Sequence, residues 1–216
     1  MAHLSLVKSL SDLREQHRSQ DELLLEPLGL ALTRGTLIEF SGPSGCGKTS
    51  LAVMLLARLT AAGEACAAVD ASGGFDAVSA AAAGVDMRNL LWIRCRGDIE
   101  KAFMAADLLV QAKGFGAVWL NLSGLPERRL RLVPRTYWYR YRTRIRETPT
   151  ILAVTSAEPV TGSASQRSFR LERTAAVWSG GGRFKLLREL RPDIASRKAA
   201  AAERFQGLFE MDYSGA

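Results

Sequence analysis

The sequence predicts an α/β fold in which helices flank a mainly parallel sheet and an antiparallel hairpin follows on the C-terminal side. Short apolar segments alternate with segments of helical periodicity through most of the chain. A glycine-rich loop at 42–49 separates one apolar segment from a helical one, and two strand-like segments near the C-terminus flank a run of glycines. With 216 residues, the chain suits one such domain with short appendages.

The central part of the chain predicts a strict alternation of strands and helices. Apolar runs without polar alternation are typical of parallel strands that are buried on both faces. The expected strands are 36–41, 65–70, 90–93, 117–122 and 150–155. The expected helices are 48–62, 75–83, 98–113 and 135–147. A further short helix is expected at 4–18. Pro27 and Gly29 then end this N-terminal segment, before the core begins.

The C-terminal part breaks this alternation. Residues 157–168 are small, polar and rich in turn formers, which predicts a mobile loop. Segments 169–178 and 183–190 predict the hairpin, and the tail from Arg191 is expected to be partly helical because alanines at 199–202 favour helix. The expected organisation is an N-terminal helix and linker, a core and a tail, with bounds 1–27, 28–190 and 191–216.

Residues 42–49 read Gly-Pro-Ser-Gly-Cys-Gly-Lys-Thr and match the phosphate-loop pattern at every fixed position. Glycines let backbone N–H groups point at phosphate oxygens, Lys48 can reach the terminal phosphates, and the Thr49 hydroxyl can ligate Mg²⁺. The pattern predicts ATP and Mg²⁺ as ligands; the alternative is a relic loop that no longer binds. The candidate nucleotide-binding residues are Gly42, Pro43, Ser44, Gly45, Cys46, Gly47, Lys48, Thr49 and Ser50.

Composition narrows the class of protein. Three cysteines at widely spaced positions favour a reducing cytoplasm and indicate neither a disulfide framework nor a zinc site. We expect a cytoplasmic protein without a membrane partner, because no apolar run is long enough for a span and the first residues lack a signal-peptide layout. The net charge is +7, and the stretch 127–147 alone carries +6. A basic surface of this kind favours nucleic acid as a partner.

The basic stretch also contains aromatic residues at helical spacing. Trp138, Tyr141 and Ile145 share one helix face, which predicts that they pack in the core. The arginines then form either an ordinary solvated face or a patch that faces DNA or a partner protein. The DNA is single-stranded by expectation, because aromatics can stack on unpaired bases. The candidate DNA-binding residues are Arg128, Arg129, Arg131, Arg135, Arg140, Arg142, Arg144, Arg146, Arg167 and Arg170.

From Leu28 to Leu190 the order of these features resembles the RecA recombinase core. The phosphate loop is the most specific feature, Ala67-Ala68-Val69-Asp70-Ala71 resembles the second core strand, and residues 83–91 resemble the family stretch that follows it. The loop 157–168 stands where that family keeps a DNA-binding loop. The resemblance implies a RecA-like core with ATP, DNA and self-association as expected properties.

The departures from that family concern its catalytic residues. By resemblance, the catalytic glutamate position falls on Ser72 and the magnesium-supporting aspartate position on Asn121. The tyrosine that stacks on adenine falls on Ser79, and the lysines at the subunit interface fall near Arg188 and Leu190. Serine and asparagine neither deprotonate water nor offset the charge of Mg²⁺. ATP hydrolysis is therefore expected to be weak or absent.

Two nearby carboxylates, Asp70 and Asp76, are the candidates to replace the missing catalytic groups. A short RecA-like chain with a degraded catalytic set resembles the ImuA family, which implies an accessory role in DNA-damage tolerance and mutagenesis. The partners so implied are RecA, an ImuB-type adaptor and an error-prone DNA polymerase. The alternatives are an active DNA-dependent ATPase that forms filaments and, in a third class, a P-loop kinase of a small molecule.

Overall fold

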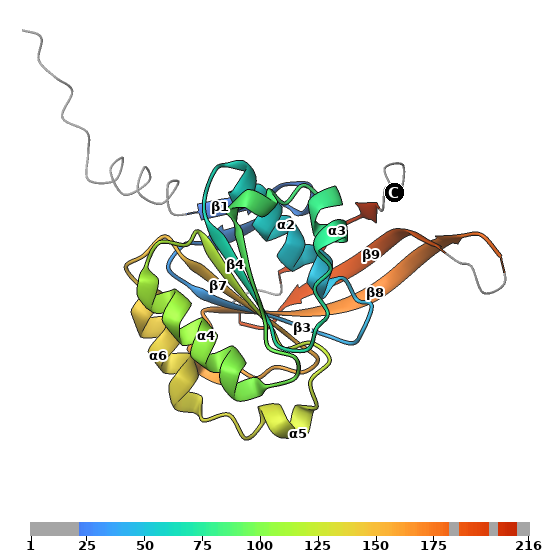
Figure 1. Ribbon diagram of the computed structural model, residues 1–216. Coiled ribbons are helices and arrows are strands. Elements are labelled where there is room, and N and C mark those ends of the chain that lie inside the picture. The colour runs from blue at the N-terminus through green and yellow to red at the C-terminus, as the bar shows by residue number, and fades with distance from the viewer. Residues whose placement is uncertain (1–21, 182–185, 199–202, 211–216) are drawn as a thin grey trace, which may run out of the picture.

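The computed structural model describes residues 22–181, 186–198 and 203–210. Within these residues a nine-stranded sheet has the order β10-β9-β8-β3-β7-β6-β4-β5, and β11 pairs with β9 (Figure 1). The strands from β8 to β5 in this order are parallel, whereas β9 runs antiparallel to β8. The predicted fold class is confirmed.

The five central strands lie close to their predicted positions. Their bounds are β3 Leu37–Ser41, β4 Cys66–Asp70, β5 Leu90–Arg94, β6 Ala117–Asn121 and β7 Ile151–Ser156. Along β4, Cys66 and Ala68 enter one core cluster while Ala67 and Val69 enter the other. Successive strand side chains point to opposite faces, so a strand between two layers of helices is apolar at most positions.

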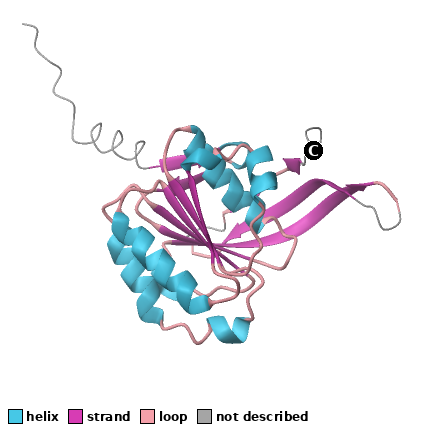
Figure 2. Cartoon of the chain, in the orientation of Figure 1, coloured by secondary structure: helices cyan, strands magenta, loops and turns pink. Residues whose placement is uncertain are grey.

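Helices cover both faces of the sheet (Figure 2). One layer contains α2 (Lys48–Ala61) and α3 (Ala77–Ala82), and the other contains α4 (Ile99–Ala112), α5 (Glu127–Leu130) and α6 (Arg135–Ile145). The sequence patterns did not predict α5. Helix α3 is shorter than predicted, because Asp76 caps its N-terminus and Phe75 is buried against Trp92 and Trp119.

The predicted apolar face of α6 is confirmed. Trp138, Tyr141 and Ile145 are all buried in the core between α6 and the sheet. The Trp138 ring meets Phe103 of α4 edge-on, and the Tyr141 hydroxyl donates to the Phe103 carbonyl oxygen at 2.6 Å. Burial raises the pKa of the Tyr141 phenol. Helical spacing alone therefore identified the inward face of α6, and the structure adds that this face also contacts α4.

The predicted hairpin is present and longer than expected. Strands β8 (Arg167–Ser179) and β9 (Leu186–Ser196) pair antiparallel, and their outer part extends beyond the helices (Figure 1). Strands β10 (Arg204–Gln206) and β11 (Phe209–Glu210) then return to β9. The expectation of a partly helical tail is wrong for the described residues, because Phe209 is buried and Phe205 packs against the core. Residues 199–202 lie outside them.

Before the sheet, a small antiparallel pair was missed by the sequence patterns. Strands β1 (Glu22–Leu25) and β2 (Leu30–Thr33) flank the 3₁₀ turn η1 (Glu26–Leu28) and place alternate leucines in the α2-side core. The helix expected at 4–18 lies outside the described residues. Of the helices in the described ranges, none has the length and apolar character that a membrane crossing needs.

Candidate functional site

The phosphate loop connects β3 to α2, and backbone hydrogen bonds hold its first glycine against β7. The Gly42 N–H donates to the carbonyl oxygens of Ser156 and Ala157, at the end of β7. A side chain at this position would collide with the Leu171 carbonyl oxygen, and a Cβ on Gly47 would lie 3.1 Å from the Phe209 ring. Only glycine fits at these two points, so the backbone approaches closely there and the loop forms a tight cradle.

Lys48 occupies the centre of that cradle. Its side chain is buried, and Nζ donates to the carbonyl oxygens of Gly42 at 2.6 Å and Pro43 at 2.8 Å. Burial lowers the pKa of the Lys48 ammonium, because desolvation disfavours its charged form. Thr49 is exposed in the first turn of α2. A glycine cradle, a buried amine and a helix N-terminus together fit a chain of phosphates.

Two cavities adjoin the loop on either side of the start of α2. The phosphate-loop pocket, about 450 Å³, lies between the loop, residues 123–125 and the hairpin. The helix pocket has a volume of about 490 Å³. It lies between α2 and α3, and residues 208–210 line one side of it. They share Thr49 and Ser50, so one elongated ligand could occupy both. Among the described residues, no acidic side chain lines the phosphate-loop pocket.

Asp70 lies at the end of β4 and is completely buried. One carboxylate oxygen accepts the N–H groups of Gly73 and Gly74 at 3.0 and 3.1 Å, and the other accepts that of Phe75 at 3.0 Å. Asn121, its register partner on β6, donates to the same carboxylate at 3.2 Å. The idea that Asp70 replaces the missing catalytic group is not supported, because its oxygens shape the loop after β4.

The Asn121 side chain is likewise committed to its neighbours. Its carbonyl oxygen accepts the Thr155 hydroxyl at 3.0 Å and the Ser123 N–H at 3.1 Å. Trp119 in turn donates to the Thr155 hydroxyl at 3.0 Å. Ser72 is half-buried, and its Oγ lies 3.6 Å from the position of a Cβ on Gly124. This cluster is a structural hydrogen-bond network beneath the pocket.

Asp76 lies elsewhere. It caps α3 by accepting the Ser79 N–H at 2.9 Å. Hydrogen bonding to the Ser79 side chain, and then to its backbone N–H, holds the pKa of the Asp76 carboxyl below the ordinary value. Its side chain lines the helix pocket rather than the phosphate-loop pocket. Asp76 is therefore not positioned beside Lys48, where a water attacking a terminal phosphate would have to lie.

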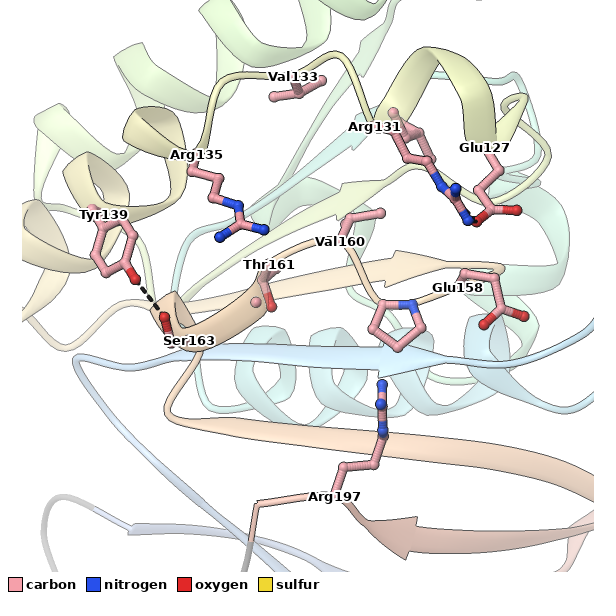
Figure 3. A pocket seen from close by; sticks show the side chains of 13 residues that line it. Glu127, Arg131, Val133, Arg135, Tyr139, Glu158, Val160, Thr161, Ser163 and Arg197 are labelled. Atoms are coloured by element: carbon pink, nitrogen blue, oxygen red, sulfur yellow. Dashed lines mark hydrogen bonds and ion pairs between the residues drawn. The ribbon is translucent and has the colours of Figure 1, made fainter.

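A third hollow, the arginine cavity, has a volume of about 570 Å³ and lies between the α5–α6 region and residues 158–163. Arg131, Arg135 and Arg197 line it, and Arg135 and Arg197 approach the 158–163 segment from opposite sides in Figure 3. Tyr139 also lines the cavity and is hydrogen-bonded to Ser163 (Figure 3). Arg197 was missed by sequence reasoning because it lies far along the chain from the basic stretch.

The predicted arginines divide into those whose side chains have a protein partner and those whose side chains have none among the described residues. Arg140 and Arg144 both pair with Asp107 and so tie α6 to α4. Arg167 pairs with Glu203 of the C-terminal segment, Arg170 with Glu158, and Arg131 with Glu127. Arg129 and Arg142 donate to backbone oxygens. Those that form no hydrogen bond or ion pair with a described residue are Arg128, Arg135 and Arg146.

The segment expected to be a mobile loop is hydrogen-bonded to two charged side chains, the buried Glu39 and the exposed Lys198. Glu39, in the middle of β3, accepts the N–H groups of Val160 and Thr161 at 2.7 and 2.9 Å. Lys198 donates to the carbonyl oxygens of Gly162 and Ser165 at 2.5 and 2.6 Å. The segment is a loop with one 3₁₀ turn, Gly162–Ala164, as the sequence predicts in outline, and its mobility stays a prediction. The available signal for these contacts was Glu39 itself, one carboxylate in an apolar strand, which must find donors when buried.

A parallel sheet with a phosphate loop after β3 defines a P-loop α/β domain. Residues 19–122 match the model of the RecA N-terminal domain family. The chain is 38% identical to Protein RecA of Bacteroides thetaiotaomicron over 88 residues, which cover 41% of this chain and 26% of that protein. It is 42% identical to Protein RecA of Rhizobium leguminosarum bv. viciae over 81 residues, which cover 38% and 23%.

The aligned part thus spans about a quarter of the length of these curated relatives. The family match over residues 19–122 contains the phosphate loop, Asp70 and Asp76, and ends one residue after Asn121. The matches support membership of the RecA-like superfamily for the part of the chain that they cover. The hairpin and the arginine cavity lie beyond the matched family domain.

Proposed function

We propose that this chain is a RecA-like accessory protein of DNA-damage tolerance, which binds ATP with Mg²⁺ and hydrolyses it weakly or not at all. The observation that carries the proposal is the composition of the phosphate-loop pocket. Lys48 and Thr49 line it, and no acidic side chain of the described residues does. Binding needs N–H donors and a cation, whereas hydrolysis also needs a group that orients or deprotonates water.

In this proposal the bound nucleotide supplies a triphosphate and its Mg²⁺, and the chain's own residues hold them. The Lys48 ammonium, which now donates to the carbonyl oxygens of Gly42 and Pro43, would donate to phosphate oxygens instead. The Thr49 hydroxyl would be a ligand of the metal. Asp70 and Asn121 do not take part, because their polar atoms are hydrogen-bonded to the backbone and to each other.

The nucleotide proposal is tested by measuring binding and turnover on the same preparations. We expect wild type to bind Mg²⁺–ATP and Lys48→Ala to lose at least about tenfold in affinity, the scale of a charge-assisted contact. Turnover should stay at the level of a protein-free control, with and without single-stranded DNA. Steady turnover that Lys48→Ala abolishes would refute the non-hydrolytic part and favour the active ATPase that forms filaments.

We also propose that the arginine cavity binds the backbone of single-stranded DNA. Arg135 and Arg197 offer guanidinium groups to phosphates, whereas Arg131 pairs with Glu127, which lines the cavity together with Glu158. Tyr139 is half-exposed at 45% beside them. Phosphate contacts give affinity without sequence preference, and an aromatic ring can stack on an unpaired base. Arg140, Arg144, Arg167 and Arg170 contribute less in this proposal, because each already pairs with a carboxylate.

A salt titration tests the DNA proposal. Arg135→Ala should weaken binding to oligonucleotides of unrelated sequence equally and reduce the slope of log K against log salt by about 1. Arg58→Ala is the matched control, because Arg58 is exposed near the end of α2, on the other face of the sheet. Equal effects of the two variants would mean that net charge rather than the cavity binds DNA.

The mutagenesis role and its partners rest on resemblance to the ImuA family. We propose contacts with RecA, with an ImuB-type adaptor and with an error-prone DNA polymerase, and self-association as a further property. Pull-downs of each purified partner by the full chain, with and without ATP, test this directly. Failure of all three partners to bind in either state would reject the role while leaving nucleotide binding intact.

A further inference from the structure

One cation of the phosphate-loop pocket comes from the hairpin rather than from the phosphate loop. Arg173 lies on β8 and lines the pocket together with Lys48. Its Nη1 atom lies 3.5 Å from the position that a Cβ on Gly45 would occupy. The guanidinium of Arg173 therefore stands directly over the loop, on the side that the hairpin walls.

A β-bulge sets the direction of this side chain. Arg173 is in register with Pro192 and Ala175 with Arg191, so Thr174 is an extra residue on β8. The Thr174 hydroxyl donates to the Arg191 carbonyl oxygen at 2.8 Å, which fixes the bulge. Proline opposite Arg173 offers no N–H to the ladder. Bulges redirect side chains next to binding sites, and here the redirected residue is the one that reaches the loop.

The charges around Arg173 indicate an anionic occupant. Two other arginines of β8, Arg167 and Arg170, are each paired with a glutamate. Arg173 forms no hydrogen bond or ion pair with any described residue. It shares the pocket with Lys48, and no described carboxylate lines that pocket to balance the two cations. A phosphate group between them would neutralise both.

We propose that Arg173 binds the terminal phosphate of a nucleoside triphosphate and thereby distinguishes it from a diphosphate. The inference rests on the proposed nucleotide binding and adds its specificity. The inner phosphates contact the loop N–H groups and Lys48, while the terminal phosphate extends into the pocket towards the hairpin. A guanidinium can bind it through two parallel hydrogen bonds. A bound triphosphate then contacts both the phosphate loop and Arg173 of the hairpin, and this contact does not require hydrolysis.

The test compares the affinities of the full chain for Mg²⁺–ATP and Mg²⁺–ADP by calorimetry. Arg173→Gln should weaken ATP binding by about 10- to 100-fold, the range of hydrogen bonds to charged groups, and change ADP binding less than about twofold. Arg173→Lys should fall between, because it keeps the charge and loses the fork. Arg191→Gln is the matched control on the same hairpin and should keep the wild-type ratio, since its side chain pairs with Glu189.

A second readout uses Trp178, which is half-exposed and lines the same pocket. ATP should change the tryptophan fluorescence of wild type more than ADP does, and Arg173→Gln should remove that difference. Equal losses of ATP and ADP affinity in Arg173→Gln, with an unchanged circular dichroism spectrum, would overturn the inference. Wild type that binds neither nucleotide would instead reject the proposed function, so the two failures are distinguishable.

Discussion

Asn121 on β6 donates its side-chain amide to the carboxylate of Asp70 on β4 at 3.2 Å, and the two residues are register partners on neighbouring strands. Both are buried. The Asp70 carboxylate already accepts three backbone N–H groups. An amide beside it adds a donor, whereas a second carboxylate would add a like charge. A neutral amide at position 121 is therefore more favourable than a carboxylate, because it donates a hydrogen bond to the buried Asp70 carboxylate.

Replacing Asn121 by aspartate should destabilise the fold rather than create an ATPase. We expect Asn121→Asp to lower the free energy of unfolding by about 2–4 kcal/mol at pH 7, because two buried carboxylates cannot both be ionised easily. One carboxyl then has a folded pKa above its unfolded value of about 4. The deficit relative to wild type is small below pH 4 and grows as pH rises.

Urea unfolding at pH 4.5, 6 and 8 measures this dependence. The double variant Asp70→Asn/Asn121→Asp removes the like-charge pair and should be less sensitive to pH than the single variant. A stable Asn121→Asp protein with rapid ATP turnover would contradict our assignment of Asn121 to a structural network.

Glu39 should be essential for the 158–163 segment. Glu39→Ala leaves the N–H groups of Val160 and Thr161 and the Ser168 hydroxyl without their acceptor. We expect a loss of about 2–4 kcal/mol in unfolding free energy, the cost of buried donors left unpaired. Amide hydrogen exchange should also accelerate at Val160 and Thr161. Glu172→Ala, exposed on β8, is the control and should change stability by less than about 0.5 kcal/mol.

The inward face of α6 should determine stability, and its outward face should not. Ile145 is completely buried, so Ile145→Ala should cost about 2–4 kcal/mol through lost burial and a residual cavity. The adjacent Arg146 is exposed, and Arg146→Ala should stay within about 0.5 kcal/mol of wild type. Denaturant midpoints of the two variants check the contrast, and comparable losses in both would disprove the assigned face.

Nucleotide affinity should fall at alkaline pH earlier than an ordinary lysine would require. Burial lowers the pKa of Lys48 below 10.5, and only its cationic form attracts phosphate. Affinity for Mg²⁺–ATP should therefore begin to weaken as pH approaches that lowered pKa, and calorimetry between pH 7 and 10 measures the decline. In Lys48→Arg the decline should disappear, because a guanidinium stays charged throughout. If the affinity of wild type varied with pH as little as that of Lys48→Arg, deprotonation of Lys48 would be excluded as the cause of the decline.

The same shift has a consequence for the unliganded fold. The unfolded chain holds the Lys48 proton more tightly than the folded chain does. Stability from this group therefore rises with pH between the lowered folded pKa and 10.5. Nucleotide affinity and stability should thus move in opposite directions over this window.

Much of the fold could be predicted because its signals are local. The phosphate loop depends on residues adjacent in the chain, and the buried strands are apolar at most positions. The burial of Trp138, Tyr141 and Ile145 follows from helical spacing. The described part of the tail was mispredicted for the converse reason, while the alanines at 199–202 lie outside the described residues. Phe205 and Phe209 contact apolar partners on distant elements, and that burial favours strands.

The sequence by itself determined the phosphate loop, the parallel sheet and the basic character of the region around α6. Only the tertiary structure decided which charges remain free. Asp107 pairs with Arg140 and Arg144, and Arg173 lies over Gly45 because β8 adds to β3. The physical reason is that periodicity is encoded along the chain, whereas the partner of a charge depends on which distant strand or helix lies beside it.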